Sequence, residues 1–314
     1  MQNIKIDIND NDQTLIKFLN KYMPKAPNSL LYKWIRKKRI KVNKKRVEPS
    51  TLIYTDDIVN LYIYDEEIEK WQEEKNHIKS RIKVDIAFEN EDIIIFDKPQ
   101  NLLAHAANPE DYGNNVVDYM VDLLISRKEY IPRLEPTFRP AIVNRIDRNT
   151  FGLIIGAKNR KSLITLNKDI DNNIKKYYLA IVEGKIDKKL EIKNKLEKDN
   201  KNNVKVSKTG KESITIIRPI KYTNEYSLVE VELLTGRTHQ IRATLKDINH
   251  PIIGDRRYSN IRNDKLYTNQ QLVAYKLEFE ENIGIKSLKE KIIKSKYEEY
   301  IYNLYKKLVE NKYN

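Results

Sequence analysis

The sequence predicts an α+β fold: a large domain with a central mixed, mainly antiparallel sheet flanked by helices and a central cleft, preceded by a small α+β domain. Three observations lead to this prediction. The 314 residues are enough for one large core with an appended small domain. The charged stretch 65–81 has little apolar periodicity and separates two regions. Beyond it, strand-like and helical segments do not alternate regularly, which favours a mixed sheet over a doubly wound parallel one.

The small domain is expected over residues 1–64 and begins with two helices. Thr14 can cap the first helix, whose apolar residues fall on one face. Ser29 opens the second helix, in which one face is apolar and the other is basic. The basic residues of this second helix are Lys33, Arg36 and Lys37. Strand-like stretches follow at 40–47, around a turn at 43–45, and at 58–64.

The large domain is expected over residues 82–280, after a partly helical linker at 65–81. Apolar runs predict its strands at 93–96, 153–156, 178–182, 214–217 and 227–234. Helical spacing predicts helices at 115–126, 161–167 and 239–245. A basic tail is expected at 281–314, where the apolar spacing from residue 288 onward predicts one amphipathic helix that packs on the large domain.

The chain is strongly basic, with a formal net charge of +14. Such a charge attracts polyanions, of which nucleic acid is the commonest, and makes their binding sensitive to salt. A compositional drift toward lysine would also raise the lysine count, but it does not by itself tip the balance of signs this far. The charge therefore favours a nucleic-acid partner.

The residue types and patterns that are missing exclude several chemistries. Without cysteine there is no disulfide, thiolate zinc site, iron–sulfur cluster or cysteine nucleophile. The histidines lack metal-ligand spacing, and the glycines form no dinucleotide- or phosphate-binding loop, so we expect neither a metal nor a bound cofactor. Because no signal core or membrane-length apolar run occurs, we expect a cytoplasmic protein with no membrane partner.

The first segment with unusual chemistry is RPAIVNRIDRNTFGLIIG at 139–156, in which Asp147 lies close to two arginines. In an extended chain, Arg145 and Asp147 point to one side and Ile146 points to the other. The segment follows an apolar run and precedes a strand, so we expect the aspartate where the chain leaves the core. Alone, this pattern fits a structural ion pair as well as an active-site carboxylate.

The second segment is LTGRTHQIR at 234–242, which continues to HPIIGD at 250–255. Gly236 allows a tight turn, after which a cluster of polar residues opens a helix. Arginines at a helix N-terminus form a pocket that suits a phosphate or a carboxylate. The polar residues of this cluster are Arg237, Thr238, His239, Gln240 and Arg242.

The third segment is KYYLAIVEG at 176–184, a strand-like run that contains Tyr178. A tyrosine on the wall of a cleft can stack on an extruded base. Because the chain has 20 tyrosines, a single tyrosine in a strand is ordinarily a packing residue. Tyr178 becomes a candidate only together with the two other segments.

Together the three segments resemble the RluA-like family of pseudouridine synthases. The run NRIDRNTFGL is similar to the family signature that holds the essential aspartate, which implies a catalytic role for Asp147. TGRTHQIR is similar to a segment whose last arginine pairs with that aspartate, which implies Arg242. KYYLAIVEG is similar to the strand whose tyrosine stacks on the target uracil and is a candidate for proton transfer, which implies Tyr178. In the family, the arginine two residues before the aspartate fills the gap left by the flipped nucleotide, which implies this role for Arg145.

The resemblance extends from about residue 4 to about residue 279 and implies which residues contact RNA. IIIFDKPQNLLAH at 93–105 is similar to the family's opening strand with its Lys-Pro pair. The basic second helix, followed by Lys41-Val42-Asn43, resembles an S4-type RNA-binding domain, although a small helical cap with a solvated basic face would show the same pattern. The RNA-binding residues implied are Arg145, Arg237, His239 and Gln240 in the large domain and Lys33, Arg36 and Lys37 in the small one.

Three positions depart from the family pattern. Phe151 stands where the family usually has serine, and we expect it to reshape the cleft beside Asp147. Asn101 and Lys38 stand where glycine is common, which makes the turn into the strand after Lys38 atypical. None of these changes removes a chemical group from the implied reaction.

The resemblance implies an enzyme that isomerises specific uridines of RNA to pseudouridine by an aspartate-dependent, base-flipping reaction. An S4-type domain together with Asn144 resembles the members that act on 23S ribosomal RNA, so 23S RNA or a large-subunit precursor is the expected substrate. No obligate protein partner is evident, and a monomer is expected. The competing interpretation is a non-catalytic RNA-binding or ribosome-assembly protein on the same scaffold. That protein should have lost Asp147, Arg242 or Tyr178, and all three are present.

Overall fold

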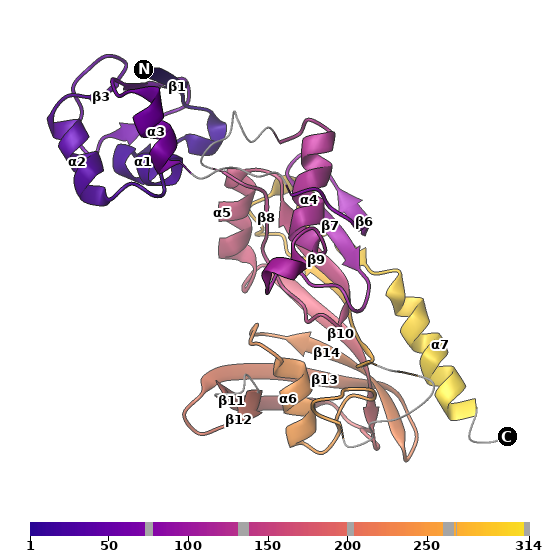
Figure 1. Ribbon diagram of the computed structural model, residues 1–314. Helices are drawn as coiled ribbons and strands as arrows, with labels where there is room; N and C mark the ends of the chain where they lie inside the picture. The colour runs from indigo at the N-terminus through magenta and orange to yellow at the C-terminus, as the bar shows by residue number, and fades with distance from the viewer. Residues whose placement is uncertain (73–77, 131–137, 200–203, 260–266, 268, 311–314) are drawn as a thin grey trace. The chain divides into compact units, whose positions relative to one another are not determined.

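The computed structural model describes residues 1–72, 78–130, 138–199, 204–259, 267 and 269–310 (Figure 1). The chain divides into two compact units. The first consists of Met1–Lys79, Met120–Ala141 and Lys158–Lys161, and the second of Ser80–Tyr119, Ile142–Ala157 and Ser162–Asn314. Within these described residues, no helix is long and apolar enough to cross a membrane.

The first unit contains a three-stranded antiparallel sheet with the order β1-β5-β3, and β2 pairs separately with β4. Apolar side chains of its helices, among them Phe18, Leu31 and Trp34, pack with the strands into one core. The strands are β1 (Gln2–Lys5), β2 (Gln13–Thr14), β3 (Ile40–Val42), β4 (Leu52–Ile53) and β5 (Ile58–Leu61). The helices are the 3-10 turn η1 (Ile8–Asp10), α1 (Leu15–Tyr22), α2 (Asn28–Arg36) and α3 (Asp65–Trp71).

Both predicted helices of the first unit are present, but their starts differ in detail from the prediction. Thr14 precedes α1 as expected, yet its side chain makes no capping hydrogen bond. Helix α2 begins one residue before the predicted Ser29 and follows Pro27, a residue type that leaves no N–H unpaired at a helix start. The helical part of the predicted linker is α3, whose Ile68 is fully buried in the core of this unit. This segment therefore packs as part of the first unit.

The second unit is organised by one 11-stranded sheet with the order β12-β11-β13-β14-β10-β15-β9-β7-β6, to which β16 adds beside β15 and β8 beside β9. Strands β9 and β15 run parallel, and the other pairs of described register run antiparallel. The predicted mixed, mainly antiparallel sheet is confirmed.

The elements after residue 80 have the following bounds. The strands are β6 (Asp85–Glu89), β7 (Ile93–Lys98), β8 (Ala141–Ile142), β9 (Phe151–Ala157), β10 (Ile174–Glu183), β11 (Leu190–Lys198), β12 (Val204–Val206), β13 (Lys211–Tyr222), β14 (Tyr226–Leu233), β15 (Leu272–Phe279) and β16 (Ile292–Lys294). The helices are η2 (Pro109–Asp111), α4 (Val116–Ser126), α5 (Arg160–Asp169), α6 (Gln240–Asp247), η3 (Lys286–Leu288) and α7 (Tyr297–Glu310).

Each predicted strand and helix of the large domain corresponds to one of these elements, but the prediction for the tail is wrong in its first part. The chain forms β16 there and becomes helical only at Tyr297. The buried Asp97 carboxylate accepts hydrogen bonds from Ser295 Oγ and from Lys296 N, both at 2.7 Å. These two bonds fix the chain to β7 and delay the start of the helix.

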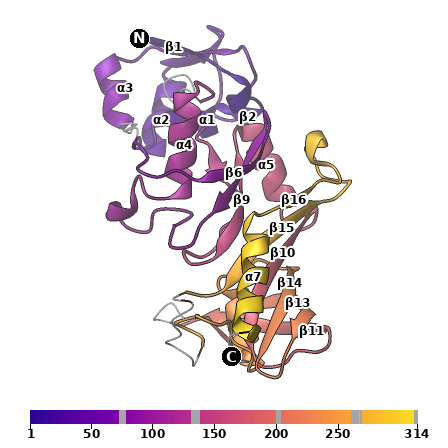
Figure 2. The same ribbon diagram turned by 90° about the vertical axis from the view of Figure 1, so that its right-hand side faces the viewer.

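Helix α7 covers the face of the sheet opposite the one that carries Tyr178 (Figure 2). Side chains alternate between the two faces of a strand, so neighbours along β10 point in opposite directions. Leu179 and Ile181 pack in one buried cluster with Ile301 and Leu304 of α7. The C-terminal helix thus covers one face of the central strands, and the other face is left for the site.

Candidate active site

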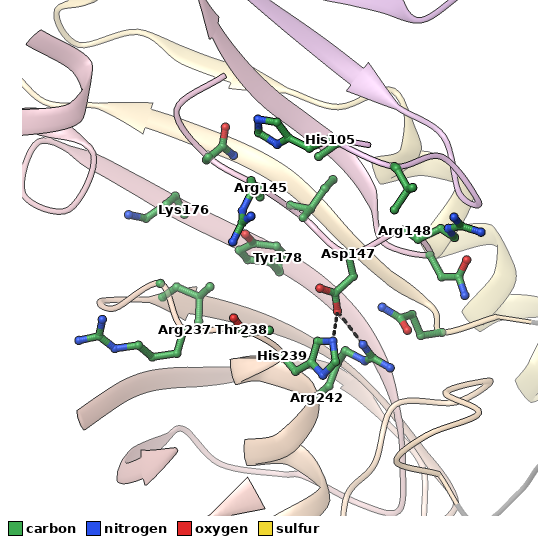
Figure 3. A pocket seen from close by; sticks show the side chains of 18 of the residues that line it. His105, Arg145, Asp147, Arg148, Lys176, Tyr178, Arg237, Thr238, His239 and Arg242 are labelled. Carbon is green, nitrogen blue, oxygen red and sulfur yellow. Dashed lines mark hydrogen bonds and ion pairs between the residues drawn. The ribbon is translucent and has the colours of Figure 1, made fainter. Parts of the chain in front are cut away.

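A cavity of about 860 Å³ lies at the face of β10 that carries Tyr178 (Figure 3). Its walls come from residues 103–107, the loop 143–149, the start of α6 and residues 254–257. Two carboxylates, Asp147 and Asp171, line it. The cationic residues that line it are Arg145, Arg148, Lys176, Arg237, Arg242, Arg256 and Arg257. This excess of positive charge suits a polyanionic ligand.

Asp147 lies in the loop between β8 and β9, with its carboxylate directed into the cavity (Figure 3). Ile146 is buried, whereas Arg145 is exposed and lines the same cavity, so the predicted alternation along this segment is confirmed. The backbone N of Thr150 donates to the carbonyl oxygen of Asp147 at 3.0 Å, which turns the chain into β9. The site therefore begins where a buried strand begins, as the sequence pattern indicated.

Lys98, at the end of β7, holds the loop that carries Asp147. Its side chain is fully buried, and Nζ donates to the carbonyl oxygens of Pro99, Leu102 and Arg148 at 2.8, 2.9 and 2.9 Å. Burial lowers the pKa of Lys98 to about 7, although the nearby Asp147 carboxylate opposes that shift. The three donors of an ammonium match the three carbonyls, so Lys98 ties the loop to the end of the strand.

Arg242 joins Asp147 to a second carboxylate. Its Nη1 donates to Asp147 Oδ2 at 2.7 Å, and its Nε and Nη2 donate to Asp255 at 2.7 and 2.8 Å. Burial alone would lower the pKa of Arg242, but the Asp255 and Asp147 carboxylates outweigh it and raise the pKa, so the guanidinium stays charged. The pairing of Arg242 with Asp147 that the resemblance implied is present in the structure.

Tyr178 and His239 complete the surroundings of Asp147. Burial raises the pKa of Tyr178, and the Asp147 carboxylate adds to the shift, so the phenol stays protonated. His239 precedes α6 in a left-handed conformation with φ 53°, and its Nε2 lies 3.7 Å from Asp147 Oδ2. Its Nδ1 is hydrogen-bonded to the Tyr258 hydroxyl at 3.1 Å, and burial lowers its pKa, which favours the neutral imidazole.

The prediction that Gln240 contacts RNA requires correction, because its amide is used within the fold. The amide oxygen accepts hydrogen bonds from Thr235 Oγ1 and from the backbone N of Arg237, at 2.9 and 3.0 Å. The amide nitrogen donates to Ile214 O and Thr215 Oγ1, at 3.1 and 3.0 Å. Gln240 is buried and is not among the residues that line the cavity. Its role is to hold the turn that presents Arg237.

Phe151 does not line the cleft, contrary to the expectation that it lies beside Asp147 in its wall. Its side chain is 7% exposed and is not among the residues that line the cavity. Its ring packs against Tyr297 and Tyr300 of α7, with ring centroids 5.0 and 5.3 Å apart. The phenylalanine therefore belongs to the interface with the C-terminal helix.

The two residues that replace glycine keep the backbone conformation that glycine favours. Asn101 has φ 60° and Lys38 has φ 58°, both in the left-handed region. Asparagine tolerates this region comparatively well, whereas a lysine there carries a cost of about 1–2 kcal/mol. The turn after Lys38 is therefore normal in shape, although its residue is unusual.

The predicted basic residues of the small domain lie along α2, in the first unit. Lys33 and Arg36 are exposed and line a cavity of about 300 Å³, together with Arg46 and the exposed Tyr32. Lys37 follows the helix as its C-terminal cap and is not among the residues that line this cavity. The structure thus brings together two of the three predicted residues and adds Arg46, which the sequence analysis did not single out.

The chain is similar to known proteins of one family. The sequence pattern described as RNA pseudouridylate synthase matches residues 92–247. A protein of Mycoplasma capricolum named as an RNA pseudouridine synthase is 34% identical over 290 residues, which cover 87% of this chain and 90% of its own length. The chain belongs to the RNA pseudouridine synthase family. It is therefore an isomerase.

Further relatives of this pseudouridine synthase are similar over most of their length. The ribosomal large subunit pseudouridine synthase C of Buchnera aphidicola subsp. Baizongia pistaciae is 32% identical, over 81% of this chain and 80% of its own. The ribosomal large subunit pseudouridine synthase D of Borreliella burgdorferi is 33% identical, over 72% and 70%. The structure of human RNA Pseudouridylate Synthase Domain Containing 4 matches with a TM-score of 0.53 at 17% identity, over 70% of this chain and 90% of its own, which shows a shared fold.

Residues that position the site in this pseudouridine synthase were not singled out from the sequence. Asp255 lies in the motif HPIIGD, but its carboxylate meets Arg242 only when the chain is folded. The Tyr258 ring contacts the same guanidinium, with 5.0 Å between the ring centroid and Arg242 Cζ. The sequence offered two signals for these residues: a carboxylate 13 residues after Arg242, and Lys98, which ends an apolar strand.

Proposed function

We propose that this cavity converts specific uridines of large-subunit (23S) ribosomal RNA to pseudouridine, with Asp147 as the catalytic carboxylate. The observation that carries the proposal is the chain of contacts from Asp147 through Arg242 to Asp255 in a cationic cavity. Asp255 binds two nitrogens of the buried Arg242 guanidinium, which leaves the third nitrogen, Nη1, for Asp147. Asp147 is thereby held in a fixed orientation at a place that a flipped nucleotide can reach.

The reaction breaks the bond between N1 of uracil and C1′ of the ribose, rotates the base and joins C5 to C1′. The C5 proton is released and N1 takes up a proton, so the product is an isomer of the substrate. Asp147 acts on the ribose, by attack at C1′ or by abstraction of the C2′ proton, and both steps need a charged, oriented carboxylate. Tyr178 stacks against the uracil. Since its phenol stays protonated, it can donate a hydrogen bond but does not serve as a phenolate base. Arg145 enters the space that the flipped nucleotide leaves and offsets part of the cost of extrusion.

The choice of substrate rests on relatives and on charge. Two relatives described above are named for the large ribosomal subunit, and this chain aligns with most of their length. The cationic cavity lined by Lys33, Arg36 and Arg46 supports an S4-type RNA-binding role for residues 1–64, which would add affinity for RNA away from the target uridine. A cytoplasmic location follows from such a substrate. Arg237 and His239 contact the RNA around the target.

The proposal is tested by tritium release from 5-tritiated ribosomal RNA that is purified from a strain lacking the gene. Wild-type protein should release tritium, and Asp147→Asn should lower the rate by about a thousandfold or more, in the range expected for loss of a positioned catalytic carboxylate. The matched control is Asp171→Asn, which removes the other carboxylate of the cavity and should keep most of the activity. Equal release by wild type and Asp147→Asn would contradict the role of Asp147. No release by wild type would support the non-catalytic RNA-binding alternative.

A further inference from the structure

We propose that a second cavity next to the active-site cavity binds the sugar-phosphate backbone of a nucleotide that flanks the target uridine. This second cavity, called here the flanking cavity, has a volume of about 460 Å³. It is lined by the end of β11, the start of β12, the start of β13 with the two residues before it, and the turn 236–238. The same turn lines the active-site cavity, so the two cavities share these three residues as a common wall. The proposal rests on the proposed function, because it assigns a site to the RNA strand that carries the target.

The charges of the flanking cavity fit a phosphate. Lys198, Lys211 and Arg237 line it and are all exposed. Its lining carboxylate, Glu197, accepts a hydrogen bond from Thr209 Oγ1 at 3.4 Å. Three exposed cations around a hollow of this size match the backbone of RNA, whose phosphates fix the position of a bound strand without reading its sequence.

Arg237 lies between the two cavities and is held there. Its Nε donates to the carbonyl oxygen of Glu212 on β13 at 3.0 Å, and its backbone N donates to Gln240. Anchoring through Nε fixes the plane of the guanidinium while the side chain remains exposed to both cavities. A phosphate that joins the target uridine to its neighbour would meet Arg237 as the strand passes from one cavity to the other.

Gly236 marks the path between the cavities. The sequence suggested that this glycine allows a tight turn, but it does not belong to the residues with positive φ. A Cβ atom added to Gly236 would meet no atom within 4 Å, whereas one added to Gly210, in the same cavity, would lie 2.3 Å from the carbonyl oxygen of Leu196. The folded chain therefore needs glycine at 210 but has room for a side chain at 236. The open space at Gly236 is where the RNA strand would cross.

The test uses two variants of the full chain that act on this path by different means. Gly236→Leu places a side chain in the crossing, with Gly236→Ala as a milder step, and the double variant Lys198→Glu/Lys211→Glu reverses two charges of the flanking cavity. The matched control is Lys193→Glu on the same strand β11, an exposed lysine about 17 Å along the strand from Lys198 by the rise of a β-strand. Near-ultraviolet circular dichroism and thermal unfolding establish that each variant is folded.

Tritium release from the same 5-tritiated ribosomal RNA should fall at least tenfold in kcat/KM for Gly236→Leu and for the double variant, less for Gly236→Ala, and less than twofold for Lys193→Glu. The double variant should also reduce the slope of log affinity against log salt by about 1–2, as expected for lost phosphate contacts. Folded Gly236→Leu and double variants that match Lys193→Glu in rate, beside an active wild type, would overturn the flanking cavity as an RNA site. An inactive wild type would instead overturn the proposed function.

Discussion

Asp255 determines how the guanidinium of Arg242 is presented to Asp147. The Asp255 side chain is fully buried, and its Oδ1 also accepts from the backbone N atoms of Arg257 and Tyr258 at 3.0 and 3.2 Å. A carboxylate fixed by its own backbone in this way cannot rotate to follow the arginine. Asp255 is therefore a positioning residue, which orients Arg242 so that one nitrogen remains for Asp147.

Replacing Asp255 by Asn should lower kcat about tenfold to a hundredfold, because a hydrogen bond to a charged group contributes about 1.5–3 kcal/mol. Arg242 donates to both oxygens of Asp255, and an amide replaces one of these acceptors by an NH2 donor. The dissociation constant for RNA should change less than threefold, since Asp255 is buried beneath the cavity. Single-turnover tritium release and RNA binding, measured on the same preparation, separate the two quantities. Asp255→Glu, which keeps the charge, should recover part of kcat. An equal loss in both variants, in proportion to lost stability, would indicate a purely structural role.

At the scale of residues, the sequence predicts groups whose role is carried by a motif and fails where the role depends on a contact between distant segments. Asp147 and Arg242 belong to two recognisable runs, and the structure brings them to 2.7 Å. The contact of Lys98 with the carbonyl of Arg148 spans 50 residues and has no local pattern. Gln240 illustrates the opposite error, because a polar residue beside the site is used to hold a turn.

At the scale of elements, the C-terminal helix α7 is attached to the sheet by aromatic packing around Phe151. The ring lies between Tyr297 and Tyr300 and is almost fully buried. Burial of one phenylalanine side chain contributes roughly 1.5–3 kcal/mol, and tilted ring pairs add up to about 1.5 kcal/mol. The residue that departs from the family pattern thus stabilises an element that lies outside the matched segment, residues 92–247.

Phe151→Ser should lower the free energy of unfolding by about 3–5 kcal/mol, the range for truncating a buried phenylalanine. Phe151→Leu, which conserves most of the volume, should cost less than about 1.5 kcal/mol. Urea unfolding followed by tyrosine fluorescence measures both. At a temperature where Phe151→Ser remains folded, its KM for RNA should equal that of wild type, because the side chain does not line the cavity. A changed KM would restore the view that Phe151 shapes the cleft.

Local patterns predict some long elements of this chain and miss others, and they fail for the short strand β16. Helix α4 appears where expected, whereas β10 begins four residues before the predicted strand 178–182. Strands β11 and β15, with nine and eight residues, were not predicted. Strand β16 has three residues and pairs with 276–278 of β15, beyond the short parallel pairing of β15 with β9 at 273–274. Asp97 fixes the chain at Ser295, directly after it. The apolar periodicity of the sequence reflects neither the pairing with β15 nor the contact with Asp97, so the predicted helix included the residues of β16.

At the scale of the whole molecule, two cationic surfaces lie on separate units and should contribute to different kinetic constants. The active-site cavity contains the groups that we propose react, whereas the cavity lined by Lys33 and Arg36 contains none of them. Affinity supplied by a surface that contains no reacting group is the same in the ground state and the transition state, so it lowers KM without raising kcat. The strong positive charge of the chain is compatible with both surfaces acting on one RNA.

Replacing Lys33, Arg36 and Lys37 by Ala together should raise KM for ribosomal RNA about tenfold and leave kcat within twofold, because only phosphate contacts are lost. The matched control replaces Lys5, Lys17 and Lys25, which are exposed in the same unit and remove the same charge. Steady-state tritium release at two salt concentrations measures the effect. If KM rises similarly in the control, the effect is due to net charge alone. A fall of kcat would contradict a surface that contributes only to binding.

The position of β15 has a consequence for when the protein becomes active during its synthesis. In the described sheet, β15 lies between β10 and β9, so the two halves of the sheet are joined by a strand that begins only at Leu272. Chains emerge N-terminus first and fold in the order in which their contacts become available. A nascent chain that ends before Leu272 already carries Asp147, Tyr178 and Arg242 but lacks the strand that brings their supports into one sheet. The enzyme should therefore remain inert during its synthesis until the segment that forms β15 has emerged from the ribosome.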